Sequence, residues 1–217
     1  MIDQHSKPTF RRLPVEKRNR LLAVAKSAFA ETGYSATNIN RIAEKAGISI
    51  GAIYKYFRSK EDLFLTVVEQ GHDLLKEVVD GIVGSGGTIM EKVEQIVRSA
   101  IAYSLRDPEF VRIYIDCTTQ GLAPLAARLS RSIESVAAEA YRRMIVEAQR
   151  TGEVDAGLDP GIAAFCLDNL FLMLQYSYGC GYYTERLGQF TGGAMDTEAM
   201  VAGVLRFIAN GLARRPR

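Results

Sequence analysis

Cysteine and histidine are scarce in this sequence of 217 residues, which has three of the first and two of the second. The three cysteines, Cys117, Cys166 and Cys180, are too few and too scattered for a disulfide scaffold or a zinc site. A reducing compartment is the simplest environment for them. The two histidines form no H-E-x-x-H motif and no pair of Glu-x-x-His motifs. The residues therefore predict no catalytic centre, no metal site and no cofactor.

The sequence also lacks the marks of secretion and of membrane insertion. Its opening residues, MIDQHSKPTFRRL, contain no apolar core of a signal peptide. The most apolar run, Gly161–Tyr183, is long enough to cross a bilayer, but its residues Asp168, Asn169 and Gln175 would be costly in lipid. A buried helix is the better interpretation. We expect a cytoplasmic protein with no membrane partner.

Charge is distributed unevenly along the chain, although the net charge is only +2. Residues 1–60 hold 12 Lys/Arg and 4 Asp/Glu, whereas residues 61–217 hold 15 Lys/Arg and 21 Asp/Glu. The first quarter thus carries +8 and the remainder −6. A basic segment on an acidic chain suggests contact with a polyanion. A basic tail that is merely solvated would give the same totals.

Apolar residues recur at helical spacing throughout, with no convincing alternating run, and the fold class predicted is all-α. Residues 1–12 look like a disordered basic arm, residues 13–58 like a small N-terminal domain and residues 59–217 like a second, larger domain. Nine helices are expected from capping residues, glycines and apolar stripes: Pro14–Thr32, Asn38–Gly47, Ser49–Phe57, Ser59–Gly84, Thr88–Arg106, Asp107–Gly121, Pro124–Thr151, Asp159–Leu187 and Asp196–Leu212.

The stretch GISIG at residues 47–51 matches G-x-S-x-G, the signature of a serine-hydrolase nucleophile. A nucleophile elbow needs a strand before the serine and a base nearby, but a helix precedes Ser49 here. We therefore interpret Ser49 as the N-cap of a short helix, and the match as accidental.

The short helix after Ser49 has two unlike faces when it is drawn at 100° per residue. Ile50, Ile53, Tyr54 and Phe57 fall on one side, and Gly51, Ala52, Lys55 and Tyr56 on the other. Glycine costs up to about 1 kcal/mol in a helix relative to alanine, which is tolerable where the backbone must approach another surface closely. A DNA major groove is such a surface. An arbitrary solvent-exposed face is the alternative.

The helix at 38–46, a tight turn at Gly47-Ile48 and the short helix together form a helix-turn-helix, whose second helix enters the major groove. The stretch Phe29–Phe64 resembles the N-terminal domain of the tetracycline-repressor (TetR) family of bacterial transcriptional regulators. The residues that carry this resemblance are Gly33, Tyr34, Thr37, Ile42, Ala43, Ala46, Gly47, Ile48, Ser49, Gly51, Tyr54, Phe57, Lys60 and Leu63. The C-terminal two-thirds resemble the family only in architecture.

The resemblance implies a homodimer that binds double-stranded operator DNA of approximate two-fold symmetry, usually as a repressor. Carried over by position, phosphate contacts fall to Thr37, Asn38, Tyr54, Tyr56 and Lys60. Contacts to base edges fall to Asn40, Ile50, Gly51, Ala52 and Lys55. Lys7, Arg11 and Arg12 either add backbone or minor-groove contacts or belong to a tail that contributes charge alone.

The resemblance also implies dimerisation through the last two helices and a small-molecule effector, unknown here but mainly apolar, in the C-terminal domain. Candidate lining residues are Tyr103, Phe110, Tyr114, Tyr141, Asp168, Phe171, Gln175 and Tyr178. Asp168 is the only charged residue between Gly161 and Tyr183, so we expect a buried carboxylate. Its partner could be an arginine of this chain, the other subunit or a cationic ligand group.

Two other classes of function stay open at this point. One is a helical small-molecule-binding protein or enzyme with an incidental helix-turn-helix resemblance. The other is a DNA-binding protein that responds to no ligand. Nothing in the sequence supplies the constellation that the enzyme would need, and a well-packed C-terminal core without a cavity would favour the second.

Overall fold

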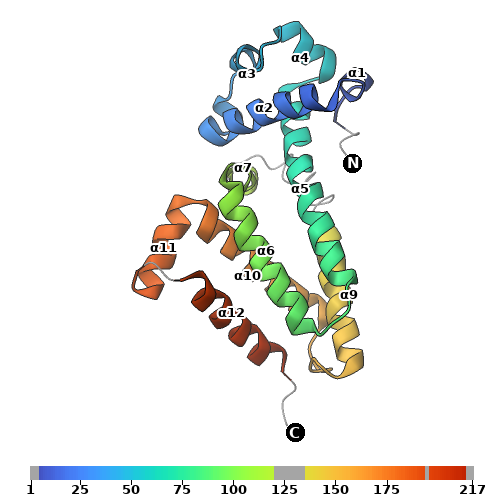
Figure 1. Cartoon of the computed structure of the whole chain (residues 1–217), viewed down its shortest axis with the longest axis vertical. Helices are drawn as coiled ribbons and strands as arrows, with labels where there is room; N and C mark the ends of the chain where they lie inside the picture. Colours follow the sequence, from blue (N-terminus) through green and yellow to red (C-terminus); the bar gives the residue numbers. More distant parts are fainter. Residues whose placement is uncertain (1–4, 120–134, 194–195, 214–217) are drawn as a thin grey trace. The chain divides into compact units, whose positions relative to one another are not determined.

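The computed structural model describes residues 5–119, 135–193 and 196–213, and within these ranges it contains helices and no strand (Figure 1). The helices of the described ranges are α1 (Pro8–Arg11), α2 (Val15–Ala36), α3 (Ile39–Ala46), α4 (Ile50–Tyr56), α5 (Lys60–Gly84), α6 (Ile89–Arg106), α7 (Pro108–Thr119), α9 (Ser135–Thr151), α10 (Pro160–Gly179), α11 (Gly181–Thr191) and α12 (Thr197–Leu212). The all-α class is confirmed.

The described helices differ from the nine expected in two places, near the N-terminus and at Cys180. An additional short helix, α1, lies within the segment expected to be disordered. The helix expected over residues 159–187 is divided at Cys180, whose extended φ of −133° separates α10 from α11. The expected helix end at Gly121 and the start at Pro124 lie outside the described residues.

The chain folds as two compact units, and α5 contributes residues to both. The first comprises Met1–Leu75 and Glu109–Ala123, and the second Lys76–Pro108 and Pro124–Arg217. The boundary expected at residue 58 therefore does not coincide with the division in packing. Two segments explain the difference, because the part of α5 up to Leu75 and the part of α7 from Glu109 belong to the first unit.

Apolar stripes of the helices build the core of the first unit. Helix α2 buries Leu22, Ala25 and Phe29 as expected. The Phe29 ring meets the Phe64 ring edge-on at a centroid distance of 4.9 Å, which joins α2 to α5. The helical course of α2 is interrupted at Gly33, whose φ of 74° is available to glycine at little cost.

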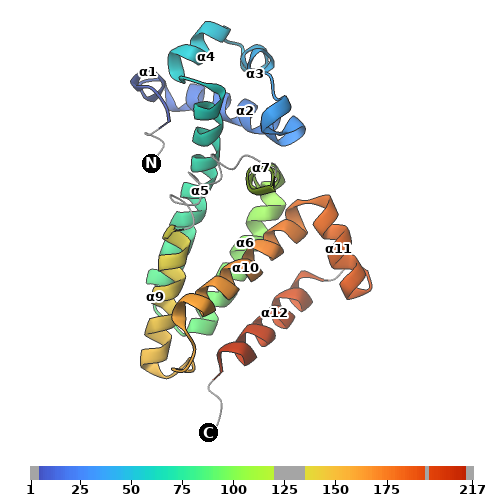
Figure 2. The same ribbon diagram turned by 180° about the vertical axis from the view of Figure 1, so that it is seen from behind.

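The N-terminal segment corrects the expectation of a disordered arm. Pro8 occupies the first turn of α1, where its missing N–H is not needed. The Phe10 side chain is completely buried, and Figures 1 and 2 show α1 beside α4. This segment thus packs against the first unit, and Phe10 is part of that unit's core.

In the second unit, α10 packs against α6, α9 and α11, and α12 packs against α6. Thr88 and Glu91 cap the start of α6 reciprocally, with Glu91 N donating to Thr88 Oγ1 at 3.2 Å and Thr88 N donating to Glu91 Oε2 at 2.7 Å. Arg98 of α6 holds α12 through two hydrogen bonds to the Glu198 carboxylate, at 2.7 and 2.8 Å.

None of the helices within the described ranges has the length and apolarity that a bilayer span requires.

Candidate nucleic-acid interface

Helix α3 is positioned by its caps and by one apolar stripe. Asn38 begins it, and its side-chain oxygen accepts a hydrogen bond from Asn40 N at 2.8 Å. The expected stripe of Ile39, Ile42, Ala43 and Ala46 is buried. Gly47 ends the helix in the left-handed region, with φ 70° and ψ 36°. This turn leads directly to Ser49.

Ser49 is the N-cap of α4, as predicted. Its hydroxyl oxygen accepts a hydrogen bond from Ala52 N at 3.2 Å, which satisfies one of the unpaired donors at a helix start. The extended backbone of Ser49 and the helix on either side provide no strand-to-helix elbow. The serine therefore has a capping role.

The outward surface of α4 is wider than the helical wheel suggested. Ile53 and Phe57 are buried as expected, but Ile50 and Tyr54 are 41% and 47% exposed. The side of the wheel that these four residues share is therefore half buried and half exposed. A helix of seven residues that buries only one side chain of its own presents most of its circumference outward.

Gly51 is not required by contacts inside the protein. A Cβ placed there would meet only the Ser49 hydroxyl oxygen within 4 Å, at an ordinary contact distance of 3.8 Å. Glycine lowers helix stability by up to about 1 kcal/mol relative to alanine. Because the residue is exposed and internal packing does not demand it, the glycine leaves the backbone of α4 open to a close approach from outside.

Lys60 has a different task from the phosphate contact expected for it. Its ammonium donates to the carbonyl oxygens of Tyr34, Ser35 and Thr37, at 2.8, 3.1 and 3.1 Å. It also lies 4.6 Å from the centre of the Tyr34 ring. An ammonium has three N–H donors, and all three are used here. Lys60 joins α5 to the end of α2, so we correct its role to a structural one.

Thr37 is also a structural residue. It is buried, and its hydroxyl donates to the Gly33 carbonyl oxygen at 2.6 Å. Its backbone N–H donates to the same carbonyl oxygen at 3.2 Å. Thr37 therefore closes the end of α2, and the phosphate contact expected from its hydroxyl does not fit this geometry.

The other expected DNA contacts lie on accessible parts of α3 and α4. Asn38, Asn40, Ile50, Gly51, Tyr54 and Lys55 are exposed, and Ala52 and Tyr56 are half-buried. The small residues and Lys55 thus share one open surface. The structure brings eight of the ten expected positions to the surface of two adjacent helices.

Sequence patterns missed the residues that support this surface from the N-terminal segment. Lys7 Nζ donates to the Tyr54 carbonyl oxygen at 2.7 Å, and Thr9 Oγ1 donates to the Lys55 carbonyl oxygen at 2.6 Å. The available signals were Pro8, which starts helices well, and Phe10, an apolar residue among basic ones.

The candidate ligand residues are divided between the two units. Phe110 and Tyr114 lie on α7 in the first unit, and the other six lie in the second. Phe110 is committed to packing, because a Cβ at Gly71 of α5 would overlap its ring. The eight residues therefore do not belong to a single packing unit.

Within the second unit, the Tyr141 ring of α9 meets the Phe171 ring of α10 edge-on at 5.5 Å. Burial raises the pKa of the Tyr141 hydroxyl, and the Asp168 carboxylate raises it further. The hydroxyl therefore keeps its proton at physiological pH and can donate a hydrogen bond. Asp168 is half-buried rather than buried, as are Gln175 and Tyr178. Tyr103 of α6 is buried, and burial likewise raises the pKa of its hydroxyl.

The structure has a capped α3, a left-handed glycine turn and a short, exposed α4 that carries the small residues Gly51 and Ala52. This arrangement defines a DNA-binding protein of the helix-turn-helix class. Comparison with known proteins agrees. Residues 21–67 match the profile of the bacterial regulatory proteins of the tetR family. The HTH-type transcriptional repressor AcnR of Corynebacterium glutamicum is 34% identical over 128 residues, which are 56% of this chain and 68% of that protein. The chain belongs to the tetR family.

Solved structures show the same fold over nearly the whole chain. A TetR family transcriptional regulator from Chloroflexus aurantiacus has a TM-score of 0.70 at 25% identity, over 97% of this chain and 100% of that one. FadR of Bacillus subtilis, solved in complex with stearoyl-CoA, has a TM-score of 0.74 at 19% identity, over 90% of this chain and 99% of that one. At that identity, the second likeness concerns the fold alone.

Proposed function

We propose that the protein is a homodimeric repressor that binds a pseudo-palindromic operator and releases it when a small, mainly apolar molecule binds the second unit. The observation that carries the proposal is the exposed face of α4, where Gly51 and Ala52 leave the backbone accessible and Lys55 stands one turn further on. Lysine pairs with the O6 and N7 atoms of guanine, and a small apolar side chain can contact the methyl group of thymine.

The charge of the first 60 residues supports this proposal. A net charge of +8 attracts duplex DNA regardless of its sequence, and the α4 face would then select among sequences. Asn38, Tyr54 and Tyr56 are proposed to contact phosphate, and Asn40, Ile50, Gly51, Ala52 and Lys55 to face base edges.

Exposed apolar residues of α10 and α12 support the dimer. Ile162, Phe165 and Met173 are exposed on α10 at helical spacing, and Phe207 is exposed on α12. Phe165 and Phe207 are each 68% exposed, although large apolar side chains gain free energy when they leave water. We propose that the same two helices of a second copy cover them. Ile208 of α12 is buried within the protomer, so a charge there would test folding rather than association.

The effector proposal rests on the residues of the second unit. Tyr103, Tyr141 and Phe171 offer aromatic surface, and Gln175, Tyr178 and Asp168 offer polar groups on the same helix as Phe171. Burial of apolar surface would supply most of the affinity, and the polar groups would orient one end of the ligand. FadR of Bacillus subtilis, which has a similar fold, was solved with stearoyl-CoA, whose acyl chain is apolar.

A protein that binds an operator acts where the chromosome is, and a cytoplasmic location is part of this proposal. A helical small-molecule-binding protein or enzyme of the same fold is one alternative. A repressor without an effector is the other alternative. A test for ligand binding distinguishes it from the ligand-responsive repressor proposed above.

The first experiment is selection of duplexes from a random-sequence pool by the purified protein. The proposal expects enrichment of one sequence with two-fold symmetry, because a symmetric dimer contacts two equivalent half-sites. Retention of DNA without any enriched sequence would contradict a sequence-specific regulator.

The second experiment is calorimetry of a candidate acyl or aromatic compound with and without the selected duplex. If the compound releases DNA, linkage requires that DNA weaken its binding by the same factor. A coupling of about 3 kcal/mol corresponds to roughly two orders of magnitude in operator affinity. Equal affinities in both titrations would show that the compound does not regulate DNA binding.

A further inference from the structure

The N-terminal segment His5–Phe10, named here the N-terminal clasp, holds the end of α4 that is farthest from its cap at Ser49. The last four carbonyl groups of any α-helix lack partners within the helix. In α4 these are the carbonyl groups of residues 53–56. The Ile53 carbonyl oxygen accepts from Phe57 N at 2.8 Å, which leaves three to be satisfied.

The clasp supplies a donor for each of the three. Lys7 Nζ donates to the Tyr54 carbonyl oxygen at 2.7 Å, and Thr9 Oγ1 to the Lys55 carbonyl oxygen at 2.6 Å. The Lys7 backbone N–H donates to the Tyr56 carbonyl oxygen at 2.8 Å. A lysine ammonium at a helix C-terminus also interacts favourably with the helix dipole.

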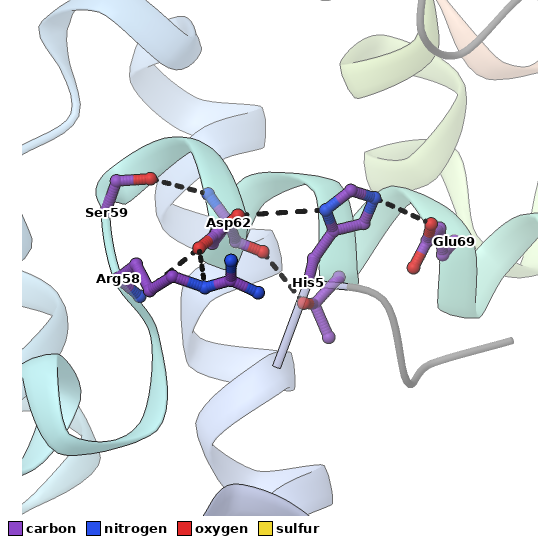
Figure 3. A network of polar contacts seen from close by, with 6 residues as sticks. His5, Arg58, Ser59, Asp62 and Glu69 are labelled. Carbon is purple, nitrogen blue, oxygen red and sulfur yellow. Dashed lines mark hydrogen bonds and ion pairs between the residues drawn. The ribbon is translucent and has the colours of Figure 1, made fainter. Parts of the chain in front are cut away.

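The two ends of the clasp are anchored in the first unit. At one end, His5 Nε2 lies 3.0 Å from Glu69 Oε1 and His5 Nδ1 lies 3.7 Å from Asp62 Oδ1, both on α5 (Figure 3). Asp62 is itself held, because its N–H donates to the Ser59 hydroxyl at 3.1 Å and its carboxylate accepts from Arg58 N at 3.3 Å (Figure 3). The imidazole is thus placed between two carboxylates of one helix.

At the other end, the Phe10 ring packs 4.8 Å from the Phe57 ring and 5.9 Å from the Tyr56 ring. Phe10 and Phe57 are both completely buried. The clasp therefore has a polar anchor on α5 and an apolar anchor just beyond α4, with its three hydrogen bonds to α4 between them.

Helix α4 depends on such outside support. Isolated helices of seven residues are not stable in water, since the nucleation cost exceeds the gain from so few hydrogen bonds. Ile53 is the buried residue of α4. The carbonyl groups held by the clasp belong to Tyr54, Lys55 and Tyr56, the residues proposed to contact DNA from the last turn.

We propose that Lys7 and Thr9 are positioning residues for DNA reading: they fix the last turn of α4 so that Lys55 is presented to the groove in one orientation. This inference rests on the proposed function, because it names residues that set the specificity of the α4 face without touching a base. Loss of the clasp frees the last turn, so the protein keeps its charge and its non-specific affinity but loses discrimination.

Thr9 provides the sharpest test, because Thr9→Val removes the hydroxyl donor without changing charge or side-chain shape. The probes are the duplex selected by the wild-type chain and a scrambled duplex of equal length and composition. Loss of one hydrogen bond predicts about fivefold weaker binding of the selected duplex by Thr9→Val, with the scrambled duplex unchanged. The control Thr9→Ser keeps the hydroxyl and should bind both duplexes as the wild type does.

Amide hydrogen exchange of the full chain without DNA gives an independent measurement. Thr9→Val and Lys7→Met should both speed exchange in α4, while exchange in α3 stays at the wild-type rate, which also shows that the variants are folded. Wild-type exchange in α4 together with wild-type discrimination by Thr9→Val would overturn the clasp. Failure of the wild-type chain to select any duplex would instead overturn the proposed function, and the exchange experiment distinguishes the two failures.

Discussion

The outer faces of α4 and α10 are both exposed, yet they differ in the size, the charge and the apolarity of their side chains. The α4 face combines the small residues Gly51 and Ala52 with Lys55 and with the exposed side chains of Ile50 and Tyr54. The α10 face carries Ile162 and Phe165, whose large apolar surfaces face water in the single protomer. The first suits a polar groove that the backbone can enter, and the second suits another apolar helix.

This difference shows that exposure alone does not identify which partner a surface binds. Binding at the α4 face should weaken steeply with salt, because counterions released from DNA supply much of the affinity. Association at the α10 face should depend little on salt, because burial of apolar surface drives it. Variants that affect one face and spare the other therefore test the assignment of partners.

The largest effect is expected from Phe165→Glu on α10. A carboxylate in the middle of an apolar interface would have to be buried without a partner, so we expect the dimer dissociation constant to rise by at least about 100-fold. Analytical ultracentrifugation at micromolar concentration measures it. Leu105→Glu is the matched control, because Leu105 is 60% exposed on α6 and lies outside the α10 and α12 faces. A wild-type protein that is a monomer at these concentrations would remove the dimer from the proposal.

The packing of α5 against α7 is tested by Gly71→Ala, for which we expect a loss of about 2 kcal/mol in the free energy of unfolding. The new Cβ would overlap the buried Phe110 ring, so α5 and α7 would have to separate. Gly81→Ala on the same helix is the control, because no atom lies within 4 Å of a Cβ there and helix propensity predicts a gain of up to about 1 kcal/mol. Urea unfolding measures both, and a gain in both would show that the close contact with Phe110 is not needed.

Lys60→Met tests whether Lys60 belongs to the DNA-binding face or to the scaffold behind it. Loss of three hydrogen bonds to carbonyl oxygens should lower the free energy of unfolding by about 1.5 kcal/mol. The salt dependence of DNA binding should stay as in the wild type, because the ammonium has no N–H left for phosphate. A slope reduced by about 1 would restore the phosphate contact first expected for it.

The smallest perturbation is alkylation of the cysteines at pH 8. Burial, with a smaller effect of Asp116, raises the pKa of the Cys117 thiol to about 12, so this residue should stay unlabelled until the protein unfolds. Cys166 is exposed on α10 beside Phe165, and the dimer should protect it. Peptide mass spectrometry should find Cys166 labelled faster in Phe165→Glu than in the wild type. Equal rates would place Cys166 outside the interface.

The sequence predicted the helix-turn-helix well because its signals are local. The stripe of Ile39, Ile42, Ala43 and Ala46 specifies the buried face of α3, and Gly47 and Ser49 mark a turn and a cap by their own chemistry. These residues specify their structure through neighbours a few positions away. A single sequence is sufficient for such an interpretation.

The errors fall where a distant part of the chain decides. In the sequence, Lys60 resembles a phosphate ligand. In the structure, its ammonium donates to backbone carbonyl oxygens near the end of α2 instead. The N-terminal segment looked disordered because its partners in α4 are 46 and 47 residues away. Helical periodicity shows which face is apolar, but it does not show what covers that face.

The central claim is that α4 reads DNA sequence through Lys55, and one binding measurement tests it most directly. The affinities of Lys55→Met for the selected and the scrambled duplex are compared with those of Lys17→Met, which removes the same charge from an exposed position on α2. We predict that Lys55→Met lowers the ratio of the two affinities by about 1–3 kcal/mol, or roughly 5- to 150-fold, whereas Lys17→Met leaves the ratio unchanged. An equal loss on both duplexes for Lys55→Met would contradict the claim, because Lys55 would then contribute only charge.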